Sequence, residues 1–153
     1  MEKVINILTY LYRNYPNSNQ LSYSRTMKIL YLIEWRFAIT KFEKLTDINW
    51  TLTRFGPYYD KLIQIFEDSQ NFDIITKFDD HNNQLLIIKF LRKSEKLPLK
   101  EDTEEVIDFV IKHVSELKWS ELNNIVNSTY GVINSKSNEI IDVVQLAKKY
   151  KNV

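Results

Sequence analysis

The sequence predicts an α+β fold that is predominantly helical, with about six helices packed around a small antiparallel sheet of about three short strands. Apolar residues recur at helical spacing in the first and last thirds of the 153-residue chain, whereas the middle third carries segments of period two. Two glycines and three prolines are few for this length, and they mark places where elements end. The length suits one domain with a substantial core, which we expect to span residues 1–153.

Two helices are predicted at the start of the chain. Residues 2–13 carry apolar side chains at 3.6-residue spacing, and a Pro-Asn-Ser-Asn cluster ends this helix. The second helix begins near Ser22 or Ser24, either of which can cap it, and runs to about Lys41. It is apolar almost all round, which is typical of the buried central element of a domain. Glu34 is a carboxylate within this apolar surface. A buried functional acid is one interpretation, but we expect an ion pair or a position at an exposed rim.

The middle of the chain is predicted to form strands. Residues 49–55 alternate in polarity, which indicates a short strand that Gly56 and Pro57 end. We expect Gly56 to adopt a backbone angle that other residues avoid, and Pro57 to open a helix over residues 58–68. Two further alternating segments flank a turn-rich stretch and predict a β-hairpin. The strands of this hairpin are residues 72–78 and 85–92.

Three helices are predicted for the last third of the chain. The first begins at Asp102 or Thr103, and its early turns are acidic, as the helix dipole favours. A short helix follows Ser120, with Gly131 in the connection after it, and the last helix starts at Asp142, which can cap it. The predicted core face of the first of these helices comprises Val106, Phe109, Val110, Val114 and Leu117.

Catalytic and metal-binding motifs are missing from the sequence. Cysteine is absent, which removes disulfides, thiolate metal ligands and cysteine nucleophiles. His81 and His113 are far apart and form no HExxH pair, and two isolated glycines allow neither a GxGxxG nor a Walker-type loop. No serine lies in a GxSxG motif, and the paired acids lie in a turn or at a predicted helix start. We therefore expect no enzyme, no cofactor and no metal site.

The charge balance predicts no general attraction to nucleic acid. Lys and Arg number 21 and Asp and Glu 20, a formal net charge of +1. The order of the predicted elements is nevertheless close to that of a winged-helix domain, and residues 1–61 carry nine basic against five acidic residues. The helix at the recognition position contains only Lys61 against three acids, whereas a helix that meets phosphates is more basic. A DNA-binding regulator stays as the alternative function.

The cellular location is predicted from two kinds of segment. The first residues show no basic region followed by an apolar one, the pattern of a signal peptide. Apolar stretches are interrupted within a few residues, far short of the ~20 that span a bilayer. We expect a cytoplasmic protein that does not cross a membrane.

A motif in the first half of the chain carries a family resemblance. It comprises, in order, Lys28, Ile29, Leu30, Tyr31, Leu32, Trp35, Ala38, Leu45, Trp50, Arg54, Phe55, Gly56, Pro57 and Tyr59. With these residues, the stretch 27–62 resembles the Panacea domain, the SocA-like family of antitoxins and phage-associated proteins. A weaker resemblance to the closing helices of that family continues at residues 119–122 and 142–150.

The resemblance implies a binding role. Members of the family neutralise a co-encoded toxin by direct contact, and some deliver the toxin to a protease. A phage or prophage protein that inhibits a host defence complex is a further alternative, and self-association is left open. The resemblance also identifies signature residues that we interpret as mainly structural: Lys28, Leu30, Tyr31, Trp35, Trp50, Phe55, Gly56 and Pro57.

The surface that binds the protein partner is predicted from aromatic and arginine residues. Tyrosine, tryptophan and arginine dominate the hot spots of protein interfaces, and the nine tyrosines of this chain are too many for one core. We expect the partner surface near the first helix and the Gly-Pro turn. Its candidate residues are Tyr12, Arg13, Arg25, Arg54, Tyr58 and Tyr59.

Overall fold

The structure, a computed structural model, describes residues 2–91 and 98–153. These ranges contain seven α-helices, a 3-10 helix and four strands, which confirms the predicted α+β, predominantly helical class. The helices are α1 (Glu2–Asn14), α2 (Tyr23–Lys41), α3 (Leu62–Asp68), α4 (Glu101–Val114), α5 (Trp119–Ser128), α6 (Tyr130–Ile133) and α7 (Val143–Lys151), with the 3-10 helix η1 at Ser18–Gln20. The strands are β1 (Thr51–Thr53), β2 (Gly56–Tyr58), β3 (Phe72–Phe78) and β4 (Gln84–Phe90).

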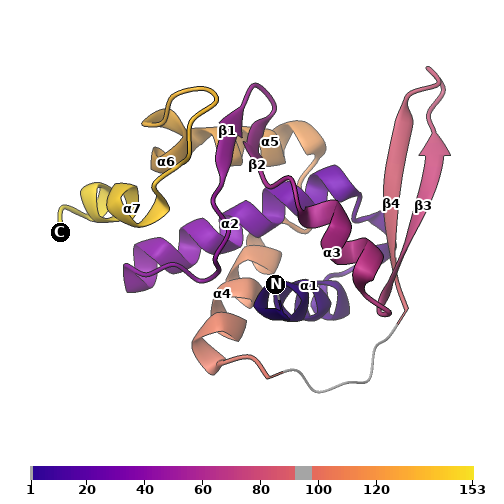
Figure 1. Ribbon diagram of the computed structural model, residues 1–153, viewed down its shortest axis with the longest axis horizontal. Coiled ribbons are helices and arrows are strands. Elements are labelled where there is room, and N and C mark those ends of the chain that lie inside the picture. The colour runs from indigo at the N-terminus through magenta and orange to yellow at the C-terminus, as the bar shows by residue number, and fades with distance from the viewer. Residues whose placement is uncertain (1, 92–97) are drawn as a thin grey trace.

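Helix α2 is the central element of the fold. It crosses the middle of the molecule and contacts α4, α5, α7, β2 and β4 (Figure 1). Most of its side chains are buried on all sides, which confirms the prediction from its apolar sequence. The side chain of Ser22, the first of the two predicted caps, accepts a hydrogen bond of 3.1 Å from the backbone N–H of Arg25.

The strands form two separate two-stranded antiparallel sheets rather than one sheet of three. The predicted hairpin of β3 and β4 is confirmed, and Arg92, the last residue of its predicted second strand, lies outside the described residues. The hairpin projects from the body of the molecule near the end of α2 where that helix begins (Figure 1). Phe72 and Phe90 are buried at its base, whereas Phe78 near its tip is exposed.

The Gly-Pro segment forms a strand, so the prediction that Pro57 opens a helix is wrong. The chain turns back after Thr53, and β2 pairs with β1 so that Leu52 faces Pro57. Proline lacks a backbone N–H and is therefore confined to sheet edges, which is where β2 lies. Helix α3 begins only at Leu62, four residues later than the predicted start.

A distant segment of the chain covers the other edge of β1. The backbone N–H of Leu52 donates to the carbonyl oxygen of Glu139 at 2.9 Å, and the N–H of Ile141 donates to the carbonyl oxygen of Trp50 at 2.8 Å. This pairing ties the β1–β2 hairpin to the segment before α7. The position of the hairpin is therefore set by contacts about 90 residues apart in sequence.

Three smaller expectations about the last third have mixed outcomes. Asp142 caps α7 as predicted, because its side chain accepts a hydrogen bond of 3.2 Å from the N–H of Gln145. Phe109 is not a core residue: it is more than one-third exposed, and the guanidinium of Arg36 lies 3.7 Å from its ring centroid. Gly131 lies inside α6 rather than in a connection. A Cβ added to this glycine would lie 2.7 Å from the hydroxyl of Tyr31.

Of the helices in the described ranges, none combines the length and the apolar character that crossing a membrane requires.

Glu34 is buried, so the expected ion pair or rim position is wrong. The residue is 1% exposed, and its carboxylate accepts hydrogen bonds from the Leu45 N–H at 2.6 Å and from the Thr46 hydroxyl at 2.5 Å. Burial raises the pKa of this carboxyl, and the hydrogen bonds from Thr46 and Leu45 oppose that shift. Glu34 therefore anchors the loop that carries the chain from α2 to β1.

Glu34→Ala is expected to lower the free energy of unfolding by about 2–4 kcal/mol. The substitution leaves the buried N–H of Leu45 and hydroxyl of Thr46 without an acceptor, and it opens a cavity. Urea denaturation measures the loss. Glu43→Ala, at an exposed position in the same loop, is the control and should change stability by no more than about 0.5 kcal/mol. Equal losses in the two variants would contradict the anchoring role.

Candidate functional site

Lys28 joins the central helix to the tip of the β1–β2 hairpin. Its side chain is almost fully buried, and its Nζ donates a hydrogen bond to the carbonyl oxygen of Phe55. Gly56, the next residue, has φ of 101°, a left-handed value that favours glycine. A Cβ at that position would lie 2.4 Å from the Lys28 Nζ. The lysine and the glycine therefore form one structural unit, and the predicted backbone angle of Gly56 is confirmed.

The hairpin tip directs aromatic side chains outward. Phe55 is 73% exposed and Tyr58 is 43% exposed, while Pro57 between them is buried. The exposed Arg54 places its guanidinium 4.7 Å from the centroid of the Phe55 ring, within the range of a cation–π contact. Phe55 therefore differs from the other signature residues, which are buried, in presenting its ring to solvent.

A groove runs from this hairpin across the start of α2 toward the second hairpin. It consists of two adjoining cavities of about 260 and 560 Å³, which share Tyr23, Ser24 and Trp119. We call the two cavities together the aromatic groove. The smaller cavity is also lined by Met27, Lys28, Thr53, Phe55, Pro57 and Tyr58. The larger cavity is also lined by Ser22, Gln84, Leu85 and Leu86.

The electrostatics of the aromatic groove are dominated by Lys28. Burial lowers the pKa of its ammonium, and no nearby charge contributes to that shift. Lys28 forms no ion pair with any of the described residues, among which an ion pair joins Lys41 to Asp102. Burial also raises the pKa of Tyr23 to about 12, which keeps this phenol protonated at neutral pH.

The predicted partner residues do not form one cluster. Tyr58 lines the aromatic groove and Arg54 lies beside it. Arg25 supports the groove indirectly, because its Nη1 donates a hydrogen bond of 3.0 Å to the carbonyl oxygen of Leu117, in the segment just before α5. Tyr59 lines a different cavity, and Arg13 is partly buried on α1.

Tyr12 cannot take part in a partner surface, so this prediction is wrong. It is 1% exposed, and its ring packs edge-on against Phe72 with centroids 5.1 Å apart. Its hydroxyl lies 2.5 Å from the hydroxyl oxygen of Thr26, and this partner allows the polar end of tyrosine to be buried.

Two groove residues were missed as candidate partner residues. Trp119 and Leu85 are each 43% exposed, and Trp119 lines both cavities. The local signal at Trp119 is a bulky aromatic side chain in the first turn of a helix, where core packing does not require it. The sequence alone does not show that α5 packs beside the start of α2, which is the contact that places Trp119 in the groove.

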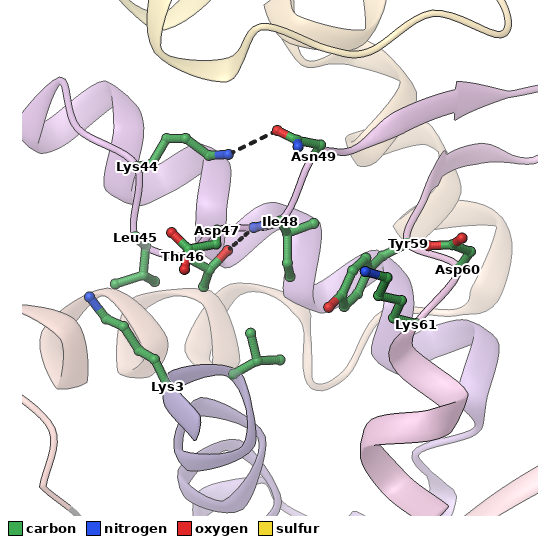
Figure 2. A pocket seen from close by; sticks show the side chains of 11 residues that line it. Lys3, Lys44, Leu45, Thr46, Asp47, Ile48, Asn49, Tyr59, Asp60 and Lys61 are labelled. Atoms are coloured by element: carbon green, nitrogen blue, oxygen red, sulfur yellow. Dashed lines mark hydrogen bonds between the residues drawn. The ribbon is translucent and has the colours of Figure 1, made fainter. Parts of the chain in front are cut away.

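A second, more polar cavity shares no lining residue with the aromatic groove (Figure 2). Its volume is about 530 Å³, and α1, the loop before β1 and the segment between β2 and α3 contribute to its walls. Three lysines, Lys3, Lys44 and Lys61, share its lining with Asp47 and Asp60. In Figure 2 the Nζ of Lys44 reaches Asn49, at 3.3 Å from its Oδ1. The charges of this cavity are nearly balanced, so it offers no strong preference for an anion or a cation.

Neither histidine lines the aromatic groove or the polar cavity. His113 stacks on Phe109 with ring centroids 4.1 Å apart, and its Nδ1 lies 2.8 Å from the carbonyl oxygen of the same residue. His81 is exposed in the turn between β3 and β4. Within residues 2–91 and 98–153, no group of three or more acidic or histidine side chains could hold a metal ion. The aromatic groove instead offers ring faces, hydroxyls and an ammonium, which are groups suited to binding a protein surface.

Comparison with known proteins identifies one family. Residues 26–130 match the family described as antitoxin SocA-like, Panacea domain, which is more than half of the chain. Neither the curated proteins nor the solved structures include a significant match. The matched residues run from α2 through both hairpins to the start of α6 and contain most of the aromatic groove.

Proposed function

The chain belongs to the antitoxin SocA-like, Panacea-domain family, and from this premise we propose that it neutralises a co-encoded toxin by direct contact through the aromatic groove. Family membership supports an antitoxin-type role. The observation that supports the groove as the contact surface is its construction: Lys28 and Gly56, two signature residues, hold the hairpin tip that exposes Phe55 and Tyr58.

The physical properties of the groove suit a protein partner. Large aromatic side chains lose little conformational entropy on binding and bury a large apolar area, so they contribute strongly to affinity. The groove is also held in place before binding, because the Lys28 hydrogen bond and the pairing of β1 with residues 138–141 fix the hairpin. A preformed surface avoids the cost of ordering a loop in the complex.

In this proposal the chain acts in the cytoplasm and without catalysis of its own. Delivery of the toxin to a protease would use the same contact, with degradation as a second step. The two modes differ in one respect: neutralisation by contact alone does not require the protease.

Growth of bacteria tests the proposal. Induction of the neighbouring open reading frame is expected to arrest growth, and co-expression of this chain is expected to restore it, with the two proteins co-purifying. Rescue that persists in a strain lacking its ATP-dependent proteases indicates inhibition by contact, and rescue lost there indicates delivery. A neighbouring product that is harmless, or that is harmful and not rescued, contradicts the proposal and favours the DNA-binding alternative.

A further inference from the structure

We infer that the partner presents a carboxylate side chain, flanked by apolar residues, that enters the smaller cavity of the aromatic groove and pairs with Lys28. The inference rests on the proposed function, because it names the chemistry of the partner at the same groove. The observation that supports it is the position of the Lys28 ammonium, which has no counter-ion among the described residues and belongs to the lining of an aromatic cavity open to solvent.

Lys28 has more hydrogen-bond donors than the Phe55 carbonyl oxygen occupies. A lysine ammonium has three N–H donors, and the Phe55 carbonyl oxygen takes one of them. The residue is 5% exposed and lines the smaller cavity, so a group that fills this cavity lies beside the ammonium in place of water. No carboxylate among the described residues forms an ion pair with it. Burying a charge without a counter-ion is unfavourable, and a carboxylate supplied by a partner removes that penalty.

Aromatic side chains line the smaller cavity together with Lys28. Tyr23, Phe55, Tyr58 and Trp119 place aromatic rings around the smaller cavity, and apolar walls strengthen an attraction between opposite charges. A volume of about 260 Å³ suits a single side chain rather than a folded segment. The polar cavity of Figure 2 differs here, because its lysines already share the lining with two aspartates.

The smaller cavity suits a carboxylate rather than a phosphate. Phosphate sites gather several cationic or backbone N–H donors, and arginine is favoured because it binds two oxygens at once. The smaller cavity contains one lysine and no arginine among its described lining residues. One positive charge matches one carboxylate.

The residues beside the carboxylate in the partner are expected to be apolar. The larger cavity continues from the smaller one and is lined by Leu85, Leu86 and Trp119. A residue adjacent to the carboxylate in the partner chain would lie against these side chains. Apolar neighbours therefore gain burial there, whereas charged neighbours would lose hydration.

Two short peptides test the inference without requiring the toxin. Acetyl-Leu-Asp-Leu-amide and acetyl-Leu-Asn-Leu-amide differ only in the charge of the central side chain. Titration into the ¹⁵N-labelled chain, followed at the indole N–H of Trp119, is expected to give saturable millimolar binding of the aspartate peptide. Binding of the asparagine peptide is expected to be at least tenfold weaker.

Substitutions identify the lysine that pairs with the carboxylate of the aspartate peptide. Lys28→Met should weaken binding of that peptide at least tenfold, to the level of the asparagine peptide. Lys44→Met, which removes a lysine from the polar cavity, is the matched control and should leave binding unchanged. The comparison of the two peptides on the unaltered chain stands even where Lys28→Met fails to fold.

The outcomes separate this inference from the proposed function. Equal binding of the two peptides, or binding of neither at 20 mM, overturns the inference. Binding of the aspartate peptide by a chain that does not neutralise the neighbouring gene product contradicts the proposed function and supports the carboxylate site.

Discussion

Gly56→Ala is expected to lower the free energy of unfolding by about 2–3 kcal/mol and to weaken partner binding. Part of the loss comes from the backbone, since φ of 101° is strained for any residue with a Cβ. The rest comes from Lys28, whose Nζ must move away from a Cβ placed 2.4 Å from it. That movement displaces the ammonium relative to the Phe55 carbonyl oxygen and so weakens their hydrogen bond. Thermal and urea denaturation measure the loss of stability.

A double-mutant cycle separates the two contributions. In a Lys28→Ala background no ammonium lies beside position 56, so Gly56→Ala should cost only the backbone strain, about 1–2 kcal/mol. The difference between the two backgrounds measures the coupling of the lysine to the glycine. Identical costs in both backgrounds would show that Lys28 and Gly56 are independent, and the structural unit described above would be refuted.

Replacing Tyr58 and Trp119 together by alanine is expected to weaken binding of the toxin by about 100-fold or more. Central aromatic residues of an interface commonly contribute about 2 kcal/mol each when truncated. Both side chains are 43% exposed in the free chain, so the fold should lose no more than about 1 kcal/mol. Isothermal titration calorimetry with the purified neighbouring gene product measures the change in affinity.

The control for the groove variant is an exposed apolar residue elsewhere. Ile133 on α6 is 65% exposed and does not line the aromatic groove. Ile133→Ala should leave the dissociation constant within about twofold of the unaltered value. A loss of affinity in Ile133→Ala with none in the groove variant would move the interface to the face that carries α6.

The elements that were predicted correctly have patterns that local sequence determines. The apolar character of α2, the cap at Ser22 and the turn between β3 and β4 each arise from residues close together in the chain. The Gly-Pro segment was misassigned because proline after a glycine suits the first turn of a helix. In the structure these two residues open the second strand of a tight hairpin whose turn is Arg54 and Phe55. Pairing of β1 with residues 138–141 accompanies the hairpin, and no local pattern reveals that pairing.

The candidate surface was only partly predictable for a related reason. Nothing in the local sequence distinguishes Tyr12 from Tyr58. Tyr12 can be buried because its hydroxyl forms a hydrogen bond with Thr26, whereas Tyr58 follows the buried Pro57 and is exposed. Trp119 joins the groove because α5 packs against α2. Burial of a tyrosine or a tryptophan thus depends on partners that are distant in the chain, which composition and periodicity do not specify.

The most direct test of neutralisation through the aromatic groove is a growth assay with three forms of this chain. The neighbouring open reading frame is induced together with the unaltered chain, the Tyr58→Ala/Trp119→Ala variant or the Ile133→Ala control, each at matched soluble levels. Normal growth is expected with the unaltered chain and the control, and growth arrest with the groove variant. Full rescue by the groove variant would contradict neutralisation through the aromatic groove.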